Sequence, residues 1–301
     1  MNGIFCVDGA AAEPLAGTAP HRPVWALVEH PGPWGREAVL DAPWPDDGTG
    51  AALAALTDGA GVRVVLGRRP GAGERGAPQR PAVVLARYGP GGWAATTTLD
   101  APADLLGLDW AGLAAAPAAP AGWTDPGPVW GICTHGTRDA CCARLGRPLA
   151  QAFAALEPAG TWEISHSGGH RFAGVALDLA AGLVYGRVGT PDAATLVRAH
   201  GEGRVVRHLL RGALHRTPPA QAAEAALRDR LDEDRLAALT LLDEAAAPGG
   251  GRASTWRHTT ADGATTWRVT VAEEPLPPRP ASCGKAPEAA SAWRPLTVDA
   301  V

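Results

Sequence analysis

The sequence predicts an α/β protein, and three observations support that class. Short apolar runs rich in strand-forming residues alternate along the chain with Ala/Leu-rich stretches of helical length. Segments rich in Gly and Pro separate these runs, as is typical of loops. Of the 301 residues, 46% are hydrophobic and 19% are charged, which indicates a core-burying chain rather than a disordered one.

Residues 1–115 are predicted to form an N-terminal α/β domain. Strands are expected at 24–30, 62–68, 82–88 and 92–99, and a helix near 49–58. The Ala/Pro-rich stretch at 116–127 predicts a linker to the next domain.

Residues 128–205 are predicted to follow the order βαβ and then ββα. The pattern predicts strands at 128–133 and 160–165, a hairpin over 173–188, and helices at about 140–156 and 191–201. Asp139 is a candidate N-cap for the first helix, and Pro148 predicts a kink or break near 146–148. This order is the thioredoxin arrangement, so residues 128–205 are expected to form a thioredoxin-like domain. A second thioredoxin-like unit is one interpretation of the N-terminal lobe.

Residues 206–301 are predicted to be an extension of helices and a β-hairpin. We expect two helical stretches in PAQAAEAALRDRLDEDRLAALTLLDEA, followed by strands in STWRHTTADG and ATTWRVTVAEE. The last ~25 residues are rich in Pro and are expected to be loosely held.

Charge and hydropathy narrow the classes of partner. The net charge of −4 shows no basic excess, so nucleic acid is not an expected partner. No stretch approaches the ~20 apolar residues of a membrane span, and the N-terminus lacks a basic region typical of a secretory signal. We therefore expect a cytoplasmic protein, in whose reducing compartment clustered cysteines are more often metal ligands or redox centres than disulfides.

The stretch GICTHGTRDACC, residues 131–142, holds three of the five cysteines. Cys133 is expected at a strand end and Cys142 in the first turn of a helix, so both thiols can converge above the loop. Cys141 and Cys142 are adjacent, and their side chains diverge by about 100° on a helix. Only one of these two can point at a common centre.

The stretch SHSGGH, residues 165–170, follows the next strand. Gly168 and Gly169 free the backbone to wrap, so that His166 and His170 can face one metal. Two thiolates with two imidazoles suit zinc or an iron–sulfur cluster rather than magnesium or calcium. The eight residues between Cys133 and Cys142 lie outside zinc-finger spacing and favour something larger than a single ion.

Several motifs carry a resemblance to a known family. CTHGTRDACCARLGRP, TWEISHSGGHRFAGVALDL and LVYGRV resemble the sucrase/ferredoxin-like family, as do EPLAGTA, VEHPGPWG and TPPAQAAEAALR. The resemblance covers about residues 10–230, and it implies that residues 128–205 are a thioredoxin-like ferredoxin domain. It implies a [2Fe–2S] cluster ligated by Cys133, Cys142, His166 and His170, and hence an electron carrier or redox sensor rather than a stand-alone enzyme. A reductase or another iron–sulfur protein is the expected redox partner.

This ligand set has consequences for the redox potential. With four thiolates the oxidised cluster is a dianion, whereas two thiolates and two neutral imidazoles make it neutral and easier to reduce. Histidine ligation also raises the potential in Rieske centres. Imidazole nitrogens not bound to iron can take up protons, so we expect a relatively high, pH-dependent potential.

Other side chains near these motifs are candidates for supporting roles. His135 is expected to orient its loop or to hydrogen-bond a cluster sulfur, and Cys141 to lie beside the centre without ligating it. Arg138, Asp139 and Arg171 are candidates for tuning the site or docking a partner. Cys6 and Cys283 receive no role.

Two other functions remain open from the sequence. One is a thioredoxin-like thiol oxidoreductase using Cys133, Cys141 or Cys142, although the chain has no CxxC motif. The other is a structural zinc site in a binding module. Glycoside hydrolysis is not expected, because it needs two carboxylates flanking a sugar pocket and no such pair is recognisable.

Overall fold

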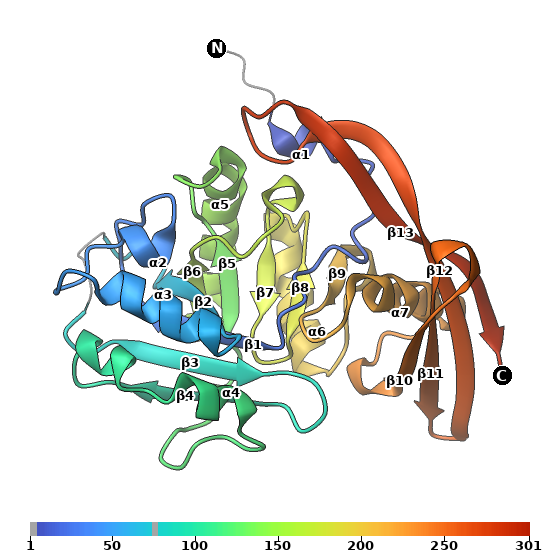
Figure 1. Cartoon of the computed structure of the whole chain (residues 1–301), viewed down its shortest axis with the longest axis horizontal. Coiled ribbons are helices and arrows are strands. Elements are labelled where there is room, and N and C mark those ends of the chain that lie inside the picture. The colour runs from blue at the N-terminus through green and yellow to red at the C-terminus, as the bar shows by residue number, and fades with distance from the viewer. Residues whose placement is uncertain (1–4, 74–77) are drawn as a thin grey trace.

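The computed structural model describes residues 5–73 and 78–301, and its largest feature is a curled nine-stranded sheet (Figure 1). The strand order is β4-β3-β1-β2-β6-β5-β7-β8-β9. These strands are β1 Val24–Glu29, β2 Arg63–Arg68, β3 Ala82–Arg87, β4 Trp93–Thr98, β5 Trp130–Cys133, β6 Thr161–Ile164, β7 Ala176–Asp178, β8 Leu183–Tyr185 and β9 Leu210–Ala213. The predicted α/β class is confirmed.

Strands from both sides of the Ala/Pro-rich stretch share this sheet. They meet where β2 pairs antiparallel with β6, Gly67 opposite Ile164. One apolar core also crosses the junction, since it joins Leu27 of β1 to Ile164 of β6 and Leu177 of β7. The predicted boundaries of the domains stay predictions, but the two halves are joined by backbone hydrogen bonds and by packing.

Helices cover the sheet at each half. Leu53 of α3 and Trp110 of α4 pack on β1 and β3, and Phe153 of α5 and Leu196 of α6 pack on β5 and β8. The helices are α1 Cys6–Gly9, α2 Ala38–Asp41, α3 Thr49–Gly59, α4 Trp110–Ala115, α5 Ala140–Leu156, α6 Ala193–Gly201 and α7 Pro218–Leu231. Short 3-10 turns are η1 Pro102–Leu106, η2 His170–Phe172, η3 Thr190–Asp192, η4 Arg207–Leu209, η5 Leu236–Ala238 and η6 Pro248–Gly250.

Helix α5 is continuous, so the break considered at Pro148 does not occur. Pro148 lies on the exposed face of the helix, where water can reach the carbonyl that its missing N–H leaves free. Across the described residues, no helix combines the length and apolar character that crossing a membrane requires.

The C-terminal part forms a second, four-stranded antiparallel sheet in the order β10-β11-β12-β13. Its strands are β10 Leu239–Ala246, β11 Arg252–Thr260, β12 Gly263–Pro280 and β13 Pro287–Ala300. The strands predicted for β11 and β12 are confirmed. Buried Trp256 and Val269 of this sheet pack against Ala223 and Leu227 of α7.

Two expectations for this part were wrong. Residues 239–246, expected in a second helix, form β10, because pairing with β11 outweighs the helix-forming tendency of an Ala/Leu-rich stretch. The last residues are not loose but form β13, paired with β12 along most of its length. Beyond Val271 the strand β12 leaves β11 and pairs only with β13, so prolines fit on its free edge and at the register shift between Leu276 and Arg279.

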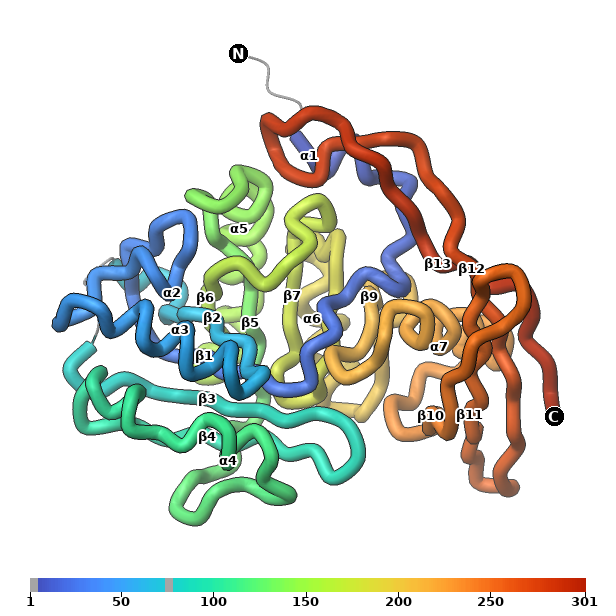
Figure 2. Tube along the Cα trace, viewed as in Figure 1, coloured from blue at the N-terminus to red at the C-terminus, as the bar shows by residue number. Residues whose placement is uncertain are grey.

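The β12–β13 ribbon reaches back over the main sheet. Figure 2 traces the N-terminal segment from β1 up to α1, which lies beside the turn between β12 and β13. Helix α1 and the β12–β13 turn therefore both contact the start of α5, through Cys6 and Cys283 beside Asp139.

Candidate metal centre

The two motifs singled out in the sequence emerge side by side at one edge of the sheet. Strands β5 and β6 are parallel, with Cys133 opposite Ile164 in the register. The carboxyl ends of parallel strands meet at one edge, where α/β proteins place their ligands. His166, which follows β6, therefore lies beside the end of β5, where the loop into α5 begins.

The first turn of α5 is fixed by its N-cap. The Asp139 carboxylate accepts a hydrogen bond of 2.9 Å from the Cys141 N–H, which confirms the predicted cap. Gly146 lets the helix approach β5, because a Cβ at this position would lie 2.0 Å from the Cys133 carbonyl oxygen. As a result, Cys142 faces the end of β5.

Four predicted side chains gather at this point, three of them in one close set. Ligand atoms of Cys133, Cys142 and His166 lie within 4.8 Å of one another. His170 lies outside that set, and its ring centroid is 5.0 Å from that of His166. Both thiols are buried, and the imidazoles of both histidines are partly buried.

The two thiols do not share one electrostatic environment. The hydrogen bond from Cys142, together with His166, lowers the pKa of Cys133 well below its usual range despite burial. The same hydrogen bond and burial raise the pKa of Cys142. Of the two thiols, Cys133 is therefore the one that loses its proton more readily.

The histidines leave one nitrogen each without a partner. The Nδ1 atoms of His166 and His170 are buried, and neither has a hydrogen-bond partner among the described residues. On the other side of the His170 ring, Nε2 lies 3.8 Å from Asp139 Oδ2. Ligating histidines commonly turn their second nitrogen toward a carboxylate, so Nδ1 is available for a metal.

The glycine pair produces the turn between the histidines, as predicted. Gly168 and Gly169 have φ values of 99° and 73°, a region that residues with a Cβ rarely adopt. Arg211 packs behind this turn and donates to the Gly168 carbonyl at 3.1 Å, and burial lowers its pKa to about 9. Sequence reasoning missed Arg211, which lies in a strand remote from both motifs.

His135 positions His166 rather than joining the ligands. Its Nε2 lies 2.7 Å from the Gly35 carbonyl oxygen, so this nitrogen carries the proton. Its Nδ1 accepts from the His166 N–H at 3.0 Å. Burial lowers the pKa of His135, which keeps this tautomer neutral. The VEHPGPWG motif thus supplies, through Gly35, the acceptor that orients the loop.

The other residues that were candidates for supporting roles make contacts outside the set of four donors. Arg138 forms an ion pair with Glu37 on the surface, and Arg171 donates two hydrogen bonds to buried Glu13 at 2.8 and 2.9 Å. Glu13 belongs to the EPLAGTA motif and also accepts from Arg279 at 2.7 Å. Cys141 points away from Cys133 and contacts Cys6 and Cys283, residues for which the sequence indicated no role.

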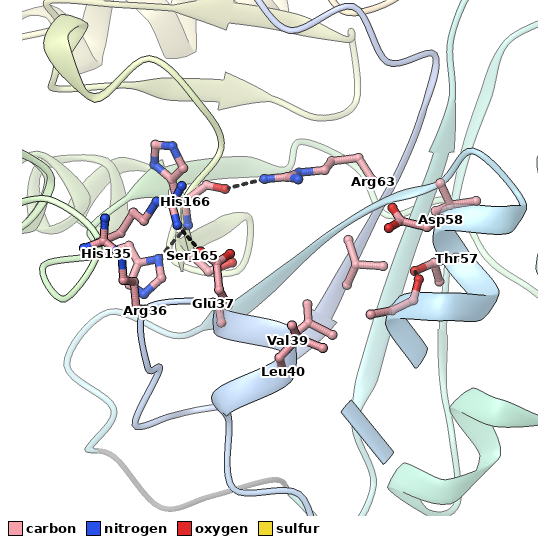
Figure 3. Close-up of a pocket in the computed structure, with 15 residues that line it drawn as sticks. Arg36, Glu37, Val39, Leu40, Thr57, Asp58, Arg63, His135, Ser165 and His166 are labelled. Atoms are coloured by element: carbon pink, nitrogen blue, oxygen red, sulfur yellow. Dashed lines mark hydrogen bonds and ion pairs between the residues drawn. The ribbon is translucent and has the colours of Figure 1, made fainter. Parts of the chain in front are cut away.

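A solvent-facing cavity of about 250 Å³ adjoins the centre (Figure 3). His166 contributes to its wall, with its carbonyl oxygen hydrogen-bonded to Arg63 at 3.1 Å and its ring turned away from Val39 and Leu40. Charged side chains line its outer part, namely Arg36, Glu37, Asp58, Arg63 and Arg138. The cavity brings the surface of the protein close to the histidine pair.

Fold and site together describe an α/β protein with a Cys/His cluster that could hold a metal ion. Residues 98–212 match a family described as sucrase/ferredoxin-like, which confirms the resemblance over that segment; the motifs EPLAGTA, VEHPGPWG and TPPAQAAEAALR lie outside it. The matched segment contains Cys133, Cys142, His166 and His170. No curated protein and no solved structure matches the chain.

Proposed function

We propose that the chain is an electron-transfer protein that binds a [2Fe–2S] cluster through Cys133, Cys142, His166 and His170. The observation that carries the proposal is the pair of buried Nδ1 atoms, without partners among the described residues, beside two buried thiols. Leaving buried polar atoms unpaired is costly, and a metal would satisfy them. When bound, the cluster would take up and release one electron.

The arrangement of donors suits this group better than a single ion. A two-iron centre with mixed ligands takes its cysteines on one iron and its histidines on the other. Here the two cysteines lie together with His166, and His170 stands outside this set beside His166, so the four donors extend beyond one compact set. The strand order β6-β5-β7-β8 and the position of Cys133 at a strand end also support the thioredoxin-like arrangement.

The rest of the chain protects and orients these ligands. Burial of Cys133 and Cys142 keeps water from the thiolates, and His135 and Arg211 hold the backbone on either side of the SHSGGH turn. The cavity beside His166 is the surface at which a redox partner, a reductase or another iron–sulfur protein, would approach. Free thiols at all five cysteines support a reducing, cytoplasmic location.

A neutral centre predicts a relatively high reduction potential. Reduction coupled to proton uptake at an imidazole also predicts that the potential falls as pH rises. Redox titrations at several pH values measure both, and a low, pH-independent potential would contradict the histidine ligands.

The test is the iron content and visible spectrum of protein expressed with iron and purified without oxygen. We expect about two irons per chain and charge-transfer absorption in the wild type. Cys133→Ser should abolish both, and His166→Ala and His170→Ala should shift the bands. His21→Ala, at an exposed histidine, is the matched control and should leave iron and spectrum unchanged.

The same preparation separates the alternatives. Colourless protein whose single zinc is lost in Cys133→Ser would replace the proposal with a structural zinc site. Colourless, metal-free protein that forms a reversible Cys133–Cys142 disulfide would favour a thiol oxidoreductase. The burial of both sulfurs argues against the latter, because exchange requires an accessible thiolate.

A further inference from the structure

A second cluster of cysteines lies on the other side of the first turn of α5. It contains Cys6 of α1, Cys141 of α5, Cys283 in the turn between β12 and β13, and the Asp139 carboxylate. Ligand atoms of all four residues lie within 4.8 Å of one another. Cys6, Cys141 and Asp139 are buried, and Cys283 is half-buried. The proposed function uses none of the three thiols.

The three sulfurs form a compact triangle. Cys6 Sγ lies 3.7 Å from both Cys141 Sγ and Cys283 Sγ, and the latter two lie 3.2 Å apart. Asp139 Oδ1 lies next to this triangle, 3.1 Å from Cys283 Sγ and 3.7 Å from Cys6 Sγ. A tetrahedral ion with metal–sulfur bonds of about 2.3 Å separates its sulfur ligands by about 3.8 Å. The donors need shifts of only a few tenths of an ångström to surround one ion.

We propose that Cys6, Cys141, Cys283 and Asp139 form a second metal site, which takes one thiophilic divalent ion, Zn²⁺. Three thiolates with one carboxylate favour zinc over magnesium or calcium, whose ligands are oxygen atoms. The close triangle favours a single ion over a cluster of irons, which would hold the three sulfurs farther apart. The site closes with four protein ligands, which is typical of a structural rather than a catalytic zinc.

The surroundings orient the carboxylate for this role. Oδ1 of Asp139 accepts from the Cys141 N–H at 2.9 Å, and Oδ2 accepts from the Cys283 N–H at 2.8 Å and from Ser282 Oγ at 2.9 Å. These donors fix the plane of the carboxylate and leave Oδ1 directed at the thiols. Such fixing of a ligating carboxylate by hydrogen bonds is a regular feature of metal sites.

The binding step is balanced without a redox reaction. Each cysteine sulfur exchanges its proton for a bond to the ion, and the three protons leave to solvent. Three thiolates and one carboxylate around Zn²⁺ give a net negative charge at the first turn of α5, a helix of 17 residues. The positive end of the helix dipole stabilises negative charge at this position.

The test is zinc content in the anaerobically purified, iron-loaded protein, measured by elemental analysis and native mass spectrometry. We expect about one zinc per chain in the wild type. Cys283→Ser and Cys6→Ser should lose the zinc while keeping the iron and the visible spectrum. Cys283 lies half-exposed in a turn, so its variant should fold even if that of buried Cys6 does not.

Two controls separate this proposal from the [2Fe–2S] proposal. Cys133→Ser should lose iron and keep zinc, and Lys285→Ala, at an exposed side chain in the same turn as Cys283, should keep both metals. Replacement of zinc by Co²⁺ should produce thiolate-to-cobalt absorption that weakens in Cys283→Ser. The proposal is overturned by wild-type protein without zinc, by zinc that survives in both cysteine variants, or by a Cys141–Cys283 disulfide in the anaerobic protein.

Discussion

Two donor clusters flank the first turn of α5, and they draw on very different lengths of chain. Cys133, Cys142, His166 and His170 come from two neighbouring loops of one sheet edge. The second cluster joins Cys6 near the start of the chain to Cys283 near its end, with Asp139 and Cys141 between them. The adjacent residues Cys141 and Cys142 belong to opposite clusters because successive side chains on a helix diverge by about 100°.

Short sequence motifs specify the first cluster, whereas only the completed fold specifies the second. The parallel pairing of β5 and β6 is enough to bring the first set together. The second set forms only when α1 and the β12–β13 turn both dock on α5. Changes that weaken long-range docking should therefore affect the second cluster first.

The largest expected effect is at Glu13, which links the two regions. Its buried carboxylate binds Arg171, the neighbour of His170 in the sequence, and Arg279 of β12. Removing the charge leaves two arginines without their anion, and we expect Glu13→Gln to cost about 3 kcal/mol at pH 7. Urea unfolding should show this loss, and zinc should be lost before iron.

The Glu13 effect should depend on pH. Burial alone would raise the pKa of Glu13, but the hydrogen bonds from Arg171 and Arg279 outweigh burial and lower it below 4.5. A lowered pKa contributes stability above the unfolded value that is lost as pH falls through the folded value. The gap between wild type and Glu13→Gln should therefore narrow below pH 4.5. A gap that widens there would show that the carboxylate is not bound as an anion.

Asp139 comes next, since it caps α5 and belongs to the second cluster. Burial raises its pKa, but hydrogen bonds from Cys283 and Cys141 outweigh it and lower the pKa to about 2. Asp139→Asn can still cap the helix but loses the charge and one acceptor, at a cost of about 1–2 kcal/mol. Zinc binding should weaken strongly and iron binding little, measured by chelator competition for each metal. Equal loss of both metals would contradict the separation of the clusters.

His135→Ala should affect only the first cluster. The variant leaves the His166 N–H and the Gly35 carbonyl without their shared partner, a loss of about 1–2 kcal/mol. Iron should dissociate faster in a chelator challenge, with zinc content unchanged. His208→Ala, at an exposed histidine, is the control for losing an imidazole elsewhere.

The smallest effect is expected at Thr137. Its hydroxyl donates to the Trp34 carbonyl at 2.8 Å and fastens the β5–α5 loop to the GPWG turn. Thr137→Val should cost about 1 kcal/mol in thermal unfolding and leave both metal contents unchanged. Loss of iron in this variant would show that the loop, rather than the ligands, determines the stability of the centre.

Much of the sheet and of the first cluster could be predicted because their signals are local. Apolar runs predicted β1 to β8, and the Asp139 cap predicted the start of α5. A glycine pair predicted the turn between the histidines. The contacts that hold the centre are not local. Gly35, Arg211 and Glu13 act on it from distant segments, and no spacing along the chain reveals such contacts.

The C-terminal errors have the same origin. An Ala/Leu-rich stretch became β10 because β11 offered a partner, and the Pro-rich tail became β13 because β12 did. Strand formation here depends on a neighbour rather than on intrinsic propensity. Cys283 could not be connected to Cys141 from the sequence because its position follows from this ribbon.

The position of the β12–β13 ribbon in the sequence also determines when the fold around the start of α5 can form during synthesis. A chain growing on the ribosome has made β5, α5 and β6 long before it reaches β13, and domains generally begin to fold from the N-terminus. Until residues 281–283 emerge, Asp139 lacks the Cys283 N–H and the Ser282 hydroxyl. Newly made protein therefore holds the histidines and cysteines near the start of α5 at an open edge, and this edge closes only once residues 281–283 have been made.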